Sequence, residues 1–139
     1  AYGLGGIRIG YGFAHEDLIT NLIKVKVPFE PSMLAQIAGN AAIDDEEFLA
    51  QTITLNKEGV RYFSEQFNQL KINFIPSATN FITTVWESDS EAQRISSALF
   101  KCGVIVRELS SFGWPNYIRI SIGTKDENRT FIKHLKNII

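Results

Sequence analysis

The chain has 139 residues, of which 45% are hydrophobic, 12% aromatic and 21% charged, a composition typical of one globular domain that can bury a sizeable core. Its 14 basic and 15 acidic residues give a net charge of -1 and form no long runs, so nothing marks a surface for nucleic acid or for an anionic membrane. No apolar stretch is long enough to span a bilayer, and none resembles a signal peptide.

Cysteine and histidine are scarce in this chain. Cys102 is the only cysteine, which excludes an internal disulfide, and the two histidines, His15 and His134, complete no cluster of the usual metal-ligand spacing. We therefore expect a cytoplasmic protein without a metal site. The chain has no initiator Met and opens on AYGLGGIRIG, which indicates a piece of a longer protein.

Glycine is concentrated at the start of the chain, at Gly3, Gly5, Gly6, Gly10 and Gly12. Such density is typical of a backbone that turns sharply or lies close against another surface. A dinucleotide-binding fingerprint is excluded, because its third glycine would have to stand where Arg8 or His15 stands. Residues 7–9 form a short strand candidate, whose central Arg8 either reaches solvent or binds an anion.

Apolar residues at helical spacing predict a short amphipathic helix from His15 to Val27, with Glu16 and Asp17 in its first turn. His15 stands at the start of this helix and is interpreted as a helix-terminal or surface residue rather than a catalytic base. The stretch Pro28-Phe29-Glu30-Pro31 then breaks the chain and is the best candidate for a linker. Pro31 suits the first position of the next helix.

Two helical segments follow the linker. The first begins near Ser32, and Asp44 with Glu47 predicts the N-cap of a second, an Asp form of the capping box. The second runs from about Leu49 to Leu70 and carries one apolar stripe, which is interpreted as core. The two segments form either one kinked helix or two helices that meet at residues 43–44.

The rest of the chain predicts two pairs of strands, each pair followed by a helix. The first pair is Lys71–Ile75 and Thr79–Trp86, and Asp89-Ser90 then caps a helix that ends at Gly103. Cys102 is expected on the buried face of that helix. The last helix, with Phe131, Leu135 and Ile138 on its buried face, begins at a capping box of Thr124 and Glu127.

The second pair of strands carries the arginines that first suggest a function. Val104–Val106 ends at Arg107, Ile118–Ile122 contains Arg119, and residues 108–116 between them are predicted to form a loop. A guanidinium within an apolar strand is costly to bury unless an anion meets it, so the two arginines suggest a site for a carboxylate or a phosphate. The alternative is that each side chain lies at a strand end and reaches water or a surface Glu.

Strands with helices on one face predict an α+β fold, a two-layer α/β sandwich, for residues 31–139. Residues 1–30 do not fit that unit, and we interpret them as the remnant of a preceding domain plus a linker. We find no internal repeat and no low-complexity segment.

Several separate motifs resemble the fold-type I, class I and II pyridoxal phosphate aminotransferases. The opening AYGLGGIRIGYG is similar to the segment that follows the Schiff-base lysine there, usually within Ser-Lys-Ala-Tyr/Phe-Gly-Leu-Ala-Gly-Leu-Arg-x-Gly. Further similar stretches, in the same order, are KVKVPFEPSMLAQIAGNAAIDDEEFL, PSATNFI and GVIVRELSSFGWPNYIRISIGTKDEN. The branch that these motifs resemble most is histidinol-phosphate aminotransferase.

The resemblance implies pyridoxal 5'-phosphate as the cofactor of the parent enzyme and the small C-terminal domain of that enzyme as the fold, preceded by a remnant of its large domain. Arg8 matches the arginine that binds the phosphate of the cofactor. Arg119, in YIRISIG, matches the arginine that holds the substrate carboxylate, and together with Arg107 it is placed to hold a substrate phosphate. Members of the family are homodimers.

Departures from the family pattern concern the chemistry directly. The Schiff-base lysine would precede Ala1, so the resemblance assigns no catalytic residue within the chain, and neither Lys24 nor Lys26 stands in the matching place. The usual Leu-Ala-Gly is Leu-Gly-Gly at residues 4–6. The usual Val-Arg-Pro reads Val-Arg-Glu, which puts Glu108 beside Arg107.

Three functions remain open from the sequence. The first is the C-terminal part of an aminotransferase that exchanges an amino group between L-histidinol phosphate and 2-oxoglutarate in histidine biosynthesis, inactive as a fragment. The second is another class I/II aminotransferase that acts on aromatic or other amino acids. The third is a non-catalytic α+β module that binds a small anion through Arg107 and Arg119 or serves only for association.

Overall fold

The structure is a computed structural model that describes residues 1–139, and it divides into two compact units, Ala1–Thr52 and Ile53–Ile139. A 3-10 helix η1 (Leu4–Ile7) and helices α1 (Glu16–Val25) and α2 (Met33–Ile43) belong to the first unit. Helix α3 (Glu46–Leu70) begins in the first unit and ends in the second. The second unit continues with β1 (Asn73–Ile75), β2 (Phe81–Val85), α4 (Asp89–Lys101), β3 (Arg107–Leu109), η2 (Ser110–Phe112), β4 (Trp114–Ser121) and α5 (Lys125–Ile138).

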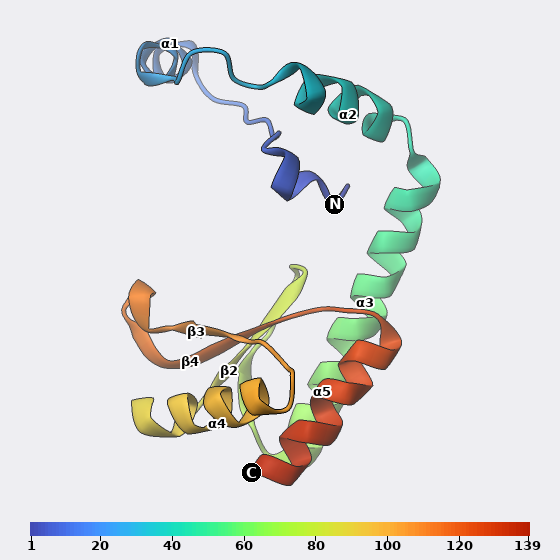
Figure 1. The fold of residues 1–139 in the computed structure, drawn as a ribbon, viewed down its shortest axis with the longest axis vertical. Helices are drawn as coiled ribbons and strands as arrows, with labels where there is room; N and C mark the ends of the chain where they lie inside the picture. The colour runs from blue at the N-terminus through green and yellow to red at the C-terminus, as the bar shows by residue number, and fades with distance from the viewer. The chain divides into compact units, whose positions relative to one another are not determined.

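The second unit is built on a four-stranded antiparallel sheet in the order β1-β2-β4-β3 (Figure 1). Strand β4 is the longest strand, and it pairs with β2 on one side and with β3 on the other. Its aromatic and β-branched residues favour a strand. Its buried positions alternate, Ile118 and Ile120 facing the core while Arg119 between them faces the other way.

One face of the sheet packs against helices and forms the core. Ile82, Ile118 and Ile120 of the sheet lie in one cluster with buried side chains of α3, α4 and α5. Phe63 and Phe67 of α3 stack with 5.6 Å between ring centroids, and Phe131 of α5 meets Phe63 edge-on at 5.4 Å. This two-layer α+β arrangement confirms the predicted fold class.

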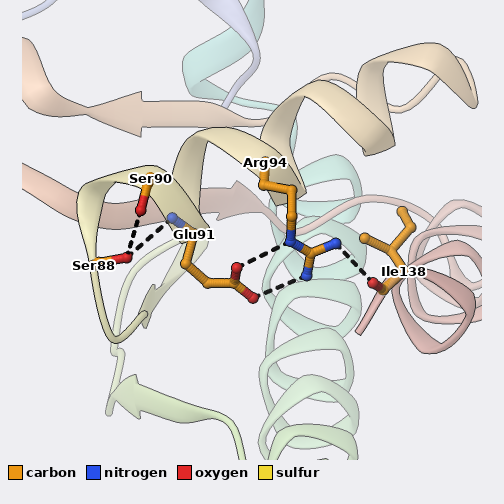
Figure 2. A network of polar contacts seen from close by, with 5 residues as sticks. All are labelled: Ser88, Ser90, Glu91, Arg94 and Ile138. Atoms are coloured by element: carbon orange, nitrogen blue, oxygen red, sulfur yellow. Dashed lines mark hydrogen bonds and ion pairs between the residues drawn. The ribbon is translucent and has the colours of Figure 1, made fainter.

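Polar contacts fix the ends of α4 and α5. Ser88, not the predicted Asp89-Ser90 pair, caps α4, since its hydroxyl accepts a hydrogen bond from the Glu91 backbone N–H. Arg94 then binds Glu91 through two hydrogen bonds and donates a third, of 3.0 Å, to the carbonyl of Ile138 at the end of α5 (Figure 2). The predicted capping box of Thr124 and Glu127 is present at the start of α5.

The first unit buries little. Ala35 is its one buried residue, and most of the apolar stripe of α1 is exposed, as are Tyr11, Phe13 and Phe29. Ser32 caps α2, so Pro31 lies before the cap and not at the first helical position as predicted. Helices α2 and α3 are separate, and Asp45, not the predicted Asp44, caps the second by accepting from the Phe48 backbone N–H at 2.9 Å. No helix of the chain combines the length and the apolar character needed to cross a membrane.

Three further expectations about the second unit are wrong. Val104–Val106 precede β3 and are not in a strand, and the predicted loop 108–116 contains η2 and parts of two strands. Strands β3 and β4 are therefore direct antiparallel partners. Cys102 is exposed and not buried, because α4 ends at Lys101 and Cys102 turns away in its C-cap, before Gly103 at a φ of 78°.

Candidate functional site

The two strand arginines lie side by side. In the β3–β4 ladder Arg107 pairs directly with Arg119, and on the other side of β4 Arg119 pairs with Thr83. Directly paired residues project from the same face of a sheet. Because Ile118 and Ile120 occupy the core face, this row lies on the opposite face, which the helices of the unit do not cover.

No acidic side chain compensates these two charges. Neither Arg107 nor Arg119 is in any ion pair, although like charges directly opposite one another destabilise a sheet. Glu108, the acid that departs from the family pattern, pairs with Ile118 and so projects to the other face. The sheet alternation therefore separates the Glu108 carboxylate from the arginines, although Glu108 and Arg107 are adjacent in sequence.

Aromatic rings take the place of carboxylates beside both arginines. The Cζ atom of Arg119 lies 5.2 Å from the ring centroid of Phe81, and that of Arg107 lies 6.0 Å from the ring centroid of Phe112. Arg119 is half-buried and Arg107 is exposed, so neither guanidinium lies within an apolar interior as the strand pattern suggested. Both remain positioned with N–H groups available to an anion.

Arg8 belongs to the first unit and is not in a strand as predicted. It follows η1 with φ 63° and ψ 46°, the left-handed region, and its Nη1 donates a 2.8 Å hydrogen bond to the carbonyl of Gly5. The side chain is exposed and meets no acid. A non-glycine residue in this conformation is uncommon, and here the bend points one guanidinium back over the glycine-rich turn.

The six arginines of the chain fall into two groups. Three are paired with an acid on the same helix, namely Arg61 with Glu65, Arg94 with Glu91 and Arg129 with Asp126. In the closest of these pairs the hydrogen bond from the guanidinium lowers the pKa of the Glu91 carboxyl. The other three, Arg8, Arg107 and Arg119, have no acidic partner, and they are the three that the sequence assigned to anion binding.

Other candidate residues have structural roles. His15 is the N-cap of α1, where its ring accepts from the Asp17 backbone N–H, as the sequence predicted. No group of three or more His, Cys, Asp or Glu side chains could hold a metal ion. The sequence did not indicate that Phe81 and Phe112 lie beside the two arginines. The register between strands brings the rings there, and no local sequence pattern shows that register.

Comparison with known proteins adds the family. A family profile described as "Aminotransferase class I and II" matches residues 1–135. The chain belongs to this family. Among aminotransferases, it is similar to the histidinol-phosphate aminotransferase of Brevibacillus brevis, with 39% identity over 138 residues, 99% of this chain and 37% of that protein. It is also similar to histidinol-phosphate aminotransferase 2 of Legionella pneumophila, with 40% identity over 136 residues, 98% of this chain and 36% of that protein.

The chain thus spans little more than a third of the length of these curated relatives. Among solved aminotransferase structures, the histidinol-phosphate aminotransferase of Sinorhizobium meliloti in complex with pyridoxal-5'-phosphate has a TM-score of 0.84 at 24% identity, covering 99% of this chain and 39% of that one. The histidinol-phosphate aminotransferase of Clostridium acetobutylicum has a TM-score of 0.83 at 22% identity, covering 98% and 42%. These two likenesses establish that the fold is that of aminotransferases.

Proposed function

We propose that the full-length protein is a pyridoxal phosphate-dependent aminotransferase that exchanges an amino group between L-histidinol phosphate and 2-oxoglutarate, and that residues 1–139 are its C-terminal part. The observation that carries this proposal is the row of Arg107 and Arg119 on the uncovered face of the sheet, where neither has an acidic partner. Curated relatives named for this substrate, at 39% and 40% identity, support it. We assign residues 1–30 to the large domain and its linker, and residues 31–139 to the small domain.

Arg8 fits the phosphate of the cofactor. Its guanidinium makes one hydrogen bond to Gly5 and no ion pair, so several N–H donors remain for a dianion. The exposed glycines beside it allow close approach of a phosphate to the backbone, since a side chain at Gly5 or Gly6 would meet nothing of this chain. When bound, pyridoxal 5'-phosphate would supply the electron sink for amino transfer.

Arg107 and Arg119 would bind and orient the substrates. Two adjacent guanidinium groups match the charge of a phosphate monoester, and either group alone matches a carboxylate through two parallel hydrogen bonds. One arginine pair could therefore accept the phosphate of L-histidinol phosphate in one half of the exchange and a carboxylate of 2-oxoglutarate in the other. The electrostatic repulsion between the two guanidinium groups would be offset when the anion binds.

Proton transfer is assigned to a lysine outside residues 1–139. Because no lysine of the chain stands in the matching place, we expect residues 1–139 alone not to transaminate. We further propose a homodimer, which the resemblance implies, and a cytoplasmic location, which the cysteine content favours.

The test is a transamination assay of the full-length protein with L-histidinol phosphate and 2-oxoglutarate, run beside phenylalanine and beside the 139-residue chain. Loss of bidentate binding in Arg119→Lys should raise KM for L-histidinol phosphate about tenfold to a hundredfold. Arg61→Lys, in an exposed arginine paired with Glu65, is the matched control and should leave KM unchanged.

Three results would contradict the proposal. Turnover of phenylalanine above that of L-histidinol phosphate would move the protein to another class I/II branch. Transamination by the 139-residue chain would show that the reaction needs no lysine outside residues 1–139. Equal KM values for Arg119→Lys and Arg61→Lys would remove the substrate role of Arg119.

A further inference from the structure

Arg119 has to stay in place without a counter-ion. A long side chain without an ion pair or a hydrogen bond samples several rotamers, and ordering it on ligand binding lowers affinity. A carboxylate partner would order the guanidinium but would also compete with the incoming anion. The structure places the ring of Phe81 there instead, at 5.2 Å from the Arg119 Cζ atom.

The sheet register brings this ring to Arg119. Phe81 pairs with Ser121, and Thr83 pairs with Arg119, so Phe81 and Arg119 are diagonal neighbours on the uncovered face. Phe81 is half-buried, and its ring lies within the distance at which a ring face attracts a cation. An aromatic face attracts the guanidinium without occupying its N–H donors in the way that a carboxylate would.

The backbone at Phe81 is fixed from several sides. Its carbonyl accepts hydrogen bonds from the hydroxyls of Ser77 and Thr79. The side chain of Asn56, on α3, donates a 3.0 Å hydrogen bond to the carbonyl of Thr79. The carbonyl of Asn80 accepts from the backbone N–H of Ile122 at 2.9 Å. The backbone that carries the ring is therefore anchored to both the helix and the sheet.

We propose that Phe81 is a positioning residue for Arg119, whose guanidinium it holds over its ring so that the N–H donors remain free for the phosphate or carboxylate of a substrate. This proposal rests on the proposed function. Arg107 and Phe112 repeat the arrangement at 6.0 Å, with an exposed ring, so the contribution of Phe112 is smaller.

The experiment separates ring electrostatics from packing. The full-length protein is titrated with inorganic phosphate while the Nε–H resonance of Arg119 is followed by NMR. Phe81→Leu should weaken phosphate binding about three- to tenfold, and Phe81→Tyr, which keeps the ring, should restore it. A trifluorinated phenylalanine at position 81 has nearly the same shape but a weakened ring quadrupole, and it should bind phosphate as weakly as the Leu variant.

Phe74→Leu is the matched control. Phe74 lies on the core face of the same sheet, where its ring meets Phe67 at 5.7 Å and no cation. This variant removes a ring and some stability but should leave the phosphate affinity of Arg119 unchanged. In the full-length protein, Phe81→Leu should raise KM for L-histidinol phosphate with little change in kcat, and Phe81→Tyr should restore KM.

The proposal is overturned if wild type and Phe81→Leu bind phosphate equally well, if the fluorinated ring binds as well as phenylalanine, or if phosphate does not shift Arg119 at all. It is also overturned if Phe74→Leu weakens binding as much as Phe81→Leu. The two proposals can fail separately. If the full-length protein does not transaminate but Phe81→Leu still weakens its phosphate binding, the proposed function is contradicted and the role of Phe81 is retained.

Discussion

At the residue scale, the arrangement around Arg107 and Arg119 favours ligand binding over stability. Two guanidinium groups on paired positions repel each other, and the structure shows no acid within 4.0 Å of either. A pair retained only for stability would have an acid between or beside the charges, as Arg94 has in Glu91. The two rings order the arginines but do not neutralise them.

Removing the charge of Arg107 should therefore stabilise the ligand-free protein. We expect Arg107→Gln to raise the free energy of unfolding by about 0.2–1 kcal/mol at low salt, because it relieves a directly opposed like-charge pair. Urea denaturation measures the change, which should shrink as salt screens the repulsion. The same substitution in Arg61, an arginine that has a carboxylate partner, should give no gain. A loss of stability in Arg107→Gln would contradict this account of the pair.

At the element scale, α3 and α5 approach each other where the sequence supplies a glycine. A Cβ atom at Gly59 would collide with the Cγ2 atom of Ile122 and would lie 3.1 Å from the Asn128 amide nitrogen. Both neighbours are held, since the Ile122 backbone N–H donates to the carbonyl of Asn80, and the Asn128 side chain makes hydrogen bonds to the backbone N–H and the carbonyl of Gly123. The glycine is the reason that the helix can lie so close to the loop before α5.

Gly59→Ala should destabilise the second unit although alanine is the better helix former. We expect a loss of about 1–2 kcal/mol, because overpacking against a β-branched side chain outweighs the gain in helix propensity of about 1 kcal/mol. Thermal denaturation measures it. Gly39→Ala is the control with a smaller expected loss, since the nearest atom there, Ile9 Cδ1 at 2.7 Å, is the end of a flexible side chain. Equal losses in the two variants would argue against the close approach at Gly59.

At the scale of the whole molecule, the two units differ in how they are stabilised. The second unit has one continuous aromatic and aliphatic core, whereas the first buries only Ala35 and exposes most of its large apolar residues. Charged contacts on the surface add a dependence on pH. Three carboxyl groups at the surface have a lowered pKa, Glu58 through a hydrogen bond from Lys125, Glu91 through one from Arg94 and Glu127 through one from the Thr124 backbone N–H.

These shifts set the direction of the pH dependence. Each folded-state pKa lies below the ordinary carboxyl value of 4.5, so the unfolded chain binds more protons as the pH falls through that value. The stabilisation is complete above 4.5 and is lost as the pH falls through the lowered values. Urea denaturation between about pH 7 and about pH 3 should show this decrease, with a smaller decrease in Thr124→Ala, which loses the Thr124 hydroxyl that donates to the Glu127 carboxylate. Constant stability across this range would contradict the contacts.

The sequence by itself determined the features that depend on neighbours a few residues apart. The strand at Phe81 to Val85, the capping box of Thr124 and Glu127, and the helix stop at Gly103 all follow from local spacing. The motifs also predicted an anion-binding role for Arg8, Arg107 and Arg119, because residue order preserves a family pattern even where the fold is not yet known, and that role stays a prediction.

Only the tertiary structure decided what surrounds these residues. The pairing of β3 with β4 sets Arg107 against Arg119, turns Glu108 to the other face and brings Phe81 to Arg119 from a strand that is distant in sequence. It also exposes Cys102 and bends Arg8 out of a strand. The register between distant strands comes from the hydrophobic face as a whole and from turn geometry, and no single stretch of sequence contains that information.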